Sequence, residues 1–141
     1  MTSHQINLIR LSWTKVSAMD PMVVGTLFYG KIFEIAPDAR DMFKTEIPEQ
    51  SKKVFSMLNY VISKLDSLED IIGEIAKLAR RHTTYGVKEE HYAVVGNALL
   101  WTLEEGLGTD WNEDLKEAWS DCYSILATAM INAAKYTAEA A

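Results

Sequence analysis

Hydrophobic residues recur at intervals of three and four positions along almost the whole chain. Such spacing places side chains on one face of an α-helix, whereas a half-buried strand would alternate at every second residue. No segment alternates in that way, and the few Gly and Pro residues lie between the periodic segments. The pattern therefore predicts an all-α fold. One run shows it clearly: Leu68, Ile71, Ile72, Ile75, Leu78, Ala79 and His82.

The ends of the predicted helices follow from start and stop residues. Asp20 before Pro21 is typical of a helix start, and Ser67 with Asp70 three residues on resembles a capping box. We expect six long or moderate helices and one short one. They lie near residues 3–16, 20–36, 37–43, 47–65, 67–82, 92–106 and 112–130.

Length, charge and cysteine content exclude several classes of protein. At 141 residues the chain is long enough to form one domain, residues 1–141, with a core of its own. The net charge of −6 argues against nucleic acid as a partner, because a phosphate backbone attracts a basic surface. No apolar run approaches the ~20 residues of a membrane span, and no secretion signal is visible. We expect a cytoplasmic domain without a membrane partner, with its one cysteine, Cys122, in the core.

His82 stands out because it ends an otherwise apolar helix face. A buried imidazole needs a partner, which can be a hydrogen-bond acceptor, a metal ion or the iron of a cofactor. The residues alone leave these three open. The sequence has no His-Glu-x-x-His, no Gly-x-Ser-x-Gly and no phosphate-binding glycine loop, and His4, His82 and His91 do not have the spacing of a chelate.

Several spacings around His82 resemble those of the globin family. Phe43 follows Pro37 by six residues, like the corner phenylalanine that stacks on haem in globins. Gln50 precedes His82 by 32 residues, a separation found between the distal and proximal positions of many globins. Three blocks are similar to bacterial single-domain globins and neuroglobins: residues 80–87, 91–96 and 118–123. The resemblance implies a globin fold, a single domain of about six to eight helices enclosing a haem pocket.

The resemblance makes His82 the proximal ligand of haem b (iron protoporphyrin IX). Ferrous haem iron takes a neutral imidazole nitrogen on one face and leaves the other face open for a diatomic gas. The resemblance also implies that a carbonyl near Leu78 orients the second ring nitrogen. A core histidine with an ordinary hydrogen-bond partner is the alternative.

By the same resemblance Tyr29 and Gln50 occupy the distal side of the pocket. Tyr29 lies 14 residues before Phe43, at a position that points into the distal pocket of globins. A phenol and an amide can both donate hydrogen bonds to bound oxygen, and similar pairs in bacterial globins hold oxygen tightly. Val54, one turn after Gln50, would form an apolar wall. Outside that family, Tyr29 would be a packing residue between helices and Gln50 an exposed polar residue.

The other haem contacts come from the same register. Lys53 is expected to meet a haem propionate, although a solvated lysine is nearly as ordinary, and an exposed pair contributes at most ~1 kcal/mol. In flavohaemoglobin-like globins a tyrosine and a glutamate bond the proximal histidine. The glutamate position here is Ala134, which argues against peroxidase-like chemistry. Tyr92 is at the position of that tyrosine. The residues at haem-packing positions are Phe43, Val87, Tyr92 and Val95.

The function that the resemblance implies is reversible binding of oxygen, and also of CO and NO, for oxygen transport or storage. One alternative is NO dioxygenation, in which oxygen stabilised by Tyr29 reacts with NO to give nitrate. A chain of 141 residues has no room for flavin and nicotinamide domains, so a separate reductase would have to restore ferrous iron. Another alternative is a haem-based gas or redox sensor whose iron is closed by an internal ligand.

Overall fold

The computed structural model describes residues 1–42, 46–84 and 88–140, and all regular secondary structure in these ranges is helical. Three short 3-10 helices are η1 (Pro37–Met42), η2 (Leu68–Ile71) and η3 (Gly108–Asp110). The α-helices are α1 (Ser3–Ser17), α2 (Pro21–Ile35), α3 (Ile47–Ser63), α4 (Ile72–Thr84), α5 (Glu89–Leu107) and α6 (Glu113–Ala140). The expected all-α fold is confirmed.

Side-chain caps close three helix starts close to their expected positions. Thr2 Oγ1 accepts a hydrogen bond from the Gln5 N–H at 3.1 Å, and Gln5 Oε1 accepts one from the Thr2 N–H at 3.0 Å. The Asp20 carboxylate accepts from the N–H two residues on at 2.9 Å, and Asn112 Oδ1 caps the start of α6 at 2.9 Å. The caps satisfy N–H groups that the first helical turn leaves without partners.

The expected capping-box start at Ser67 is wrong. There the chain forms the tight turn η2 first, in which the Asp70 N–H donates to the main-chain oxygen of Ser67 at 3.0 Å. That N–H is therefore satisfied by a carbonyl and not by the Ser67 side chain. The helical segment begins at Leu68 as a 3-10 turn and continues as α4 from Ile72. The apolar face itself is confirmed, since Ile71, Ile75 and Ala79 are buried.

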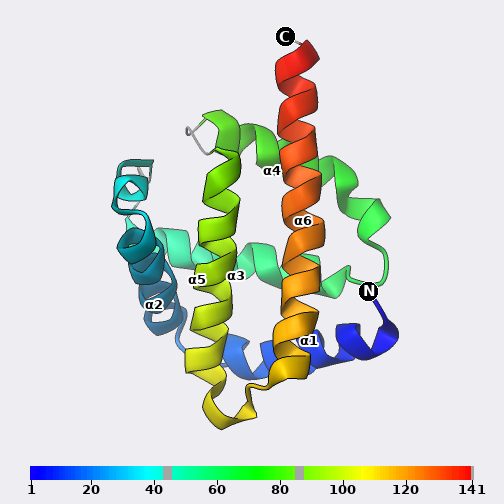
Figure 1. The fold of residues 1–141 in the computed structure, drawn as a ribbon. Helices are drawn as coiled ribbons and strands as arrows, with labels where there is room; N and C mark the ends of the chain where they lie inside the picture. Colours follow the sequence, from blue (N-terminus) through cyan, green and yellow to red (C-terminus); the bar gives the residue numbers. More distant parts are fainter. Residues whose placement is uncertain (43–45, 85–87, 141) are drawn as a thin grey trace.

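The helices cross one another in layers (Figure 1). α5 and α6 run side by side and antiparallel, while α3 lies behind them and α1 crosses below them. α2 packs against both α3 and α5, and α4 packs against α6. The chain therefore brings α2 and α3 together on one side and places α4, which carries His82, against α6.

Two tryptophans form the centre of the main core. The Trp13 ring lies 5.3 Å from Phe55 and 6.2 Å from Trp119 between ring centroids. Trp119 Nε1 donates to Ser12 Oγ at 3.0 Å, so this buried N–H has a partner. Cys122 belongs to the same cluster, and burial raises the pKa of its thiol to about 11. The cysteine is thus a small core residue, as expected.

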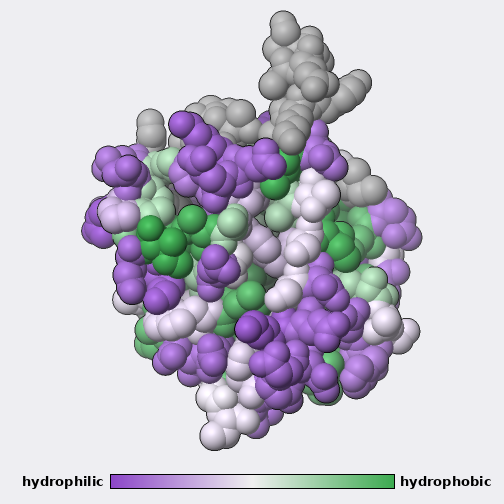
Figure 2. Space-filling model, in the orientation of Figure 1, coloured by the Kyte–Doolittle hydropathy of each residue, from purple (hydrophilic) through white to green (hydrophobic). Residues whose placement is uncertain are grey.

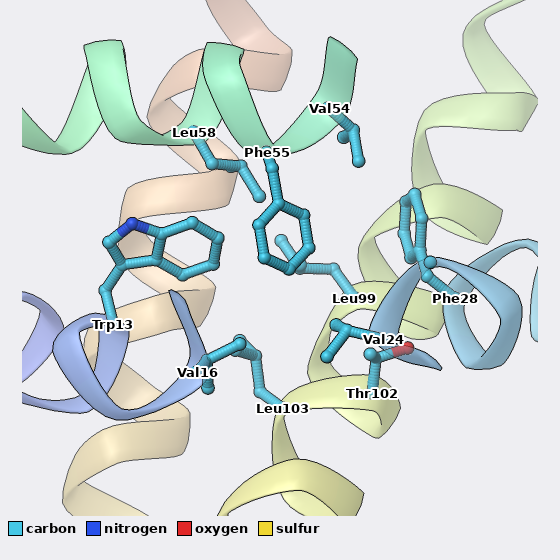
Figure 3. A pocket seen from close by; sticks show the side chains of 11 residues that line it. Trp13, Val16, Val24, Phe28, Val54, Phe55, Leu58, Leu99, Thr102 and Leu103 are labelled. Atoms are coloured by element: carbon cyan, nitrogen blue, oxygen red, sulfur yellow. The ribbon is translucent and has the colours of Figure 1, made fainter. Parts of the chain in front are cut away.

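A small apolar cavity of about 20 Å³ lies between α1, α2, α3 and α5 (Figure 3). Its volume is that of roughly one water molecule, which would need polar partners. Both polar groups in the described part of the wall have partners: the Thr102 hydroxyl donates to the Ala98 carbonyl at 2.7 Å, and Trp13 Nε1 donates to Asn59 Oδ1 at 2.6 Å. The cavity is therefore a packing gap that offers no hydrogen bond to a water.

The face seen in Figure 2 is mostly hydrophilic, with hydrophobic patches beside α2 and α5 and beside α6. None of the described helices is both long enough and apolar enough to cross a membrane.

Candidate functional site

His82 lies half-buried near the end of α4, and the expected partner of its ring is present. Its Nδ1 atom is 2.8 Å from the main-chain oxygen of Leu78, one turn earlier. A carbonyl oxygen can only accept, so Nδ1 carries the proton and, in the neutral ring, Nε2 carries the lone pair. This is the form of histidine that binds a metal ion through Nε2.

The other two histidines are placed differently. His4 is exposed in the first turn of α1. His91 Nδ1 accepts a hydrogen bond from the Lys88 N–H at 2.8 Å, at the start of α5. Its Nδ1 lone pair is therefore used to cap a helix. In the described parts of the chain, no cluster of three or more His, Cys, Asp or Glu side chains could hold a metal ion by itself.

Tyr29 and Gln50, which lie 21 residues apart in the sequence, come together where α2 meets α3. The Tyr29 side chain is 5 % exposed, and its hydroxyl donates a hydrogen bond to the main-chain oxygen of Gln50 at 3.3 Å. Gln50 is half-buried in the first turn of α3. The hydrogen bond is long for a hydroxyl donor, whose usual distance is about 2.7–2.8 Å.

Burial raises the pKa of Tyr29 to about 12. The phenol therefore keeps its proton at neutral pH, because the uncharged form tolerates a low-dielectric site better than a phenolate does. A neutral phenol is a hydrogen-bond donor. Tyr29 is thus a hydrogen-bond donor that does not release its proton near pH 7.

Two of the expected haem-pocket residues, Val54 and Val95, pack against the hydrophobic cluster that contains Tyr29. This second cluster also contains Phe28, while Val54 belongs to α3 and Val95 to α5. Tyr92, one turn before Val95 on α5, packs against the main core instead. Helices α2 and α3 therefore bring the expected distal residues together, and α5 adds the expected haem-packing residue Val95.

Other expected contacts stay predictions. Phe43 and Val87 lie outside the residues that the structure describes, as does the side chain of Ala134. Lys53 is described and exposed on α3, which fits both a solvated lysine and a contact at the mouth of a pocket.

Tyr123 of α6 contacts the main chain of the expected site residue Tyr92, a contact that the sequence reasoning did not predict. The Tyr123 hydroxyl donates to the main-chain oxygen of Tyr92 at 2.6 Å. The Tyr123 ring packs against Gly96, where an added Cβ atom would lie only 2.7 Å from Tyr123 Cε2. Burial, followed by the nearby Tyr92, raises the pKa of Tyr123. Gly96 on α5 was the only sequence signal for this contact, but a missing side chain there matters only because α6 packs close to it.

Comparison with known proteins identifies the family. The family model described as Globin matches residues 26–130. The chain belongs to the globin family. Among its relatives are Neuroglobin-1 of Oncorhynchus mykiss, 27 % identical over 92 % of this globin and 90 % of that protein, and an anaerobic nitrite reductase of Solanum lycopersicum, 35 % identical over 92 % of each chain. An anaerobic nitrite reductase of Gossypium hirsutum is 34 % identical over 92 % of this globin and 91 % of the relative.

Solved structures agree on the fold. A bacterial globin from Campylobacter jejuni superposes with a TM-score of 0.84 at 26 % identity, covering 98 % of this globin and 99 % of that chain. An engineered carbene transferase from Rhodothermus marinus superposes with a TM-score of 0.87 at 23 % identity, covering 99 % and 97 % of the two chains. The expected globin fold is confirmed.

Membership of the globin family implies a haem cofactor. The chemistry of His82 fits that group, because the Leu78 carbonyl fixes the tautomer whose Nε2 lone pair can bind iron. The buried hydroxyl of Tyr29 and the apolar side chains beside it supply the mixture of one polar donor and a hydrophobic wall that small-ligand sites have.

Proposed function

We propose that this globin binds oxygen reversibly, and also CO and NO, at a haem b held by His82. The observation that carries the proposal is the buried, neutral Tyr29 hydroxyl beside Gln50. The hydrogen bond to the Gln50 carbonyl offsets the cost of burying this hydroxyl, and the phenol stays a neutral donor that can turn to a ligand.

Each side chain has a separate task in this proposal. His82 binds the iron through Nε2, and haem supplies the ferrous iron that takes a diatomic ligand. Tyr29 donates a hydrogen bond to oxygen in the distal pocket, with the Gln50 amide as a second donor, and both favour polar oxygen over apolar CO. Val54, Val95, Tyr92, Phe43 and Val87 would line the haem ring, and Lys53 would meet a haem propionate.

An absorption spectrum of the purified protein tests the proposal. We expect a Soret band corresponding to about one haem per chain, which shifts when dithionite and then CO are added, because one side of the iron stays accessible. The bands of the ferrous protein without CO distinguish an open sixth position from an internal ligand. A folded protein that takes up no haem would contradict the proposal.

Oxygen release is expected to depend little on pH between about 6 and 10 through Tyr29. The pKa of this phenol is raised to about 12, so the donor form is fully present below that value and is lost only as the pH rises through it. Stopped-flow measurement of the oxygen dissociation rate across this range checks the expectation. An oxygen dissociation rate that rises steeply near pH 10, and does so only when Tyr29 is present, would show that the pKa of this phenol is not raised.

Nitrite reduction is the second candidate, because two relatives above 30 % identity carry the name anaerobic nitrite reductase. The reaction of nitrite to NO and water takes one electron from ferrous haem and two protons. Tyr29 keeps its proton near neutral pH, and the N–H groups of the Gln50 amide are too weakly acidic to transfer one, so neither residue is a proton source. We therefore rank gas binding first. Formation of NO from nitrite without oxygen separates the two functions.

A further inference from the structure

A close approach of α2 and α3 lies beside the Tyr29–Gln50 hydrogen bond. Gly25 and Ser51 are both buried at this crossing, and Ser51 is 0 % exposed. A Cβ atom added to Gly25 would overlap the Oγ and Cβ atoms of Ser51 and would lie 3.3 Å from its Cα. The Ser51 hydroxyl cannot simply turn away, because it donates to the Ile47 carbonyl at 2.8 Å within α3.

The crossing is linked to the distal pair through the helices themselves. Tyr29 lies four residues after Gly25, which is one turn along the same face of α2. Gln50 directly precedes Ser51 on α3. Any change in the distance between the helices at Gly25 and Ser51 therefore changes the distance between the Tyr29 hydroxyl and the Gln50 carbonyl.

We propose that Gly25 and Ser51 are positioning residues that set how strongly the distal site holds its ligand. Their contact keeps the Tyr29 hydroxyl on the Gln50 carbonyl through a long hydrogen bond of 3.3 Å, from which it can turn to a ligand. A wider crossing moves the donor away from the pocket. This inference rests on the proposed function, since it assigns a role in ligand binding to two residues outside the ligand's reach.

An exchange of side chains across the interface tests the positioning role. Gly25→Ala adds a methyl group that forces α3 away, and we expect oxygen to dissociate at least about tenfold faster. Gly25→Ala combined with Ser51→Gly removes the two overlapping atoms, so that the atom nearest the new methyl group is the Cα of residue 51, 3.3 Å away. We expect the double variant to return to within about threefold of the original rate. Gly25→Ala with Ser51→Ala keeps the Cβ clash and should not be rescued.

Gly30 provides the matched control on the same helix. It is exposed, and an added Cβ meets no atom within 4 Å. Gly30→Ala should therefore leave the oxygen dissociation rate unchanged. It also controls for the general effect of replacing a helical glycine with alanine, which favours the helix.

A second readout follows the hydrogen bond itself. The chain has only two glutamines, and only Gln50 precedes a serine, so ¹³C-carbonyl glutamine with ¹⁵N-serine labels one peptide bond. The ¹³C chemical shift of the Gln50 carbonyl is measured in the diamagnetic ferrous CO form, or in the haem-free chain if no haem binds. In the Gly25→Ala variant we expect this shift to equal the value found in the Tyr29→Phe variant, because both lose the hydrogen bond. In the double variant residue 51 is glycine, so ¹⁵N-glycine replaces ¹⁵N-serine as the label. There the Gln50 carbonyl shift should again differ from that of the same chain carrying Tyr29→Phe, because the hydrogen bond is restored.

The outcomes separate this inference from the proposed function. If haem and oxygen bind but Gly25→Ala changes neither the rate nor the carbonyl shift, the positioning role is wrong while gas binding stands. If Gly25→Ala acts but Ser51→Gly does not reverse it, the effect does not arise at this contact and the inference also fails. If Gly25→Ala does not fold, the double variant decides: near-original rates support the inference, and failure to fold overturns it.

Discussion

A His82→Gly variant is expected to bind haem roughly 100-fold or more weakly than the original chain. Loss of a residue that merely supports a metal ligand typically costs 10–100-fold in affinity, and His82 is proposed to be the ligand itself. Titration of the haem-free protein with haem, followed at the Soret band, measures the change. Millimolar imidazole should restore much of the spectrum, because it supplies the missing nitrogen in the space that the side chain leaves.

His4→Gly is the matched control for this experiment. His4 is exposed on α1, so its removal should leave haem affinity and the response to CO unchanged. Unaltered haem affinity in His82→Gly without imidazole would disprove the proximal role. It would show that the ring of His82, with Nδ1 on the Leu78 carbonyl, is an ordinary half-buried histidine.

Local chemistry explains why much of the helical framework could be predicted. A side chain that caps a helix acts on N–H groups two or three residues away, so Thr2, Asp20 and Asn112 act where they stand in the sequence. The turn at Ser67 was mispredicted because of an equally local competition. A capping side chain and a main-chain carbonyl compete for one N–H group, and the sequence does not show which of them prevails.

The site was predictable only in part, because its geometry depends on contacts between distant helices. The resemblance to globins implied a carbonyl near Leu78, one turn before His82, and that hydrogen bond is present. Tyr29 and Gln50 were expected in one pocket, but nothing local indicated that the hydroxyl bonds the main-chain oxygen of Gln50. The importance of Gly25 was equally hidden, since a missing Cβ matters only when a second helix comes close.

Tyr29→Phe is expected to raise the oxygen dissociation rate by an order of magnitude or more. Hydrogen bonds to charged groups contribute about 1.5–3 kcal/mol, and each 1.4 kcal/mol corresponds to about tenfold. The rate of CO dissociation should change much less, because CO carries little negative charge for the phenol to stabilise. Stopped-flow displacement of each gas from the ferrous protein measures both rates, and Tyr60→Phe is the control, since Tyr60 is 45 % exposed.

The dissociation rate is a sharper test of Tyr29 than the equilibrium affinity. The hydroxyl donates to the Gln50 carbonyl in this structure, so a bond to oxygen would replace a hydrogen bond that the protein already makes. Affinity reports only the difference between these bonds, whereas dissociation starts from the bound state and reports the hydrogen bond to oxygen directly. An unchanged oxygen rate would therefore show that the phenol stays on Gln50 when the ligand is bound, and equal acceleration of both gases would indicate a change in pocket shape instead of a lost donor.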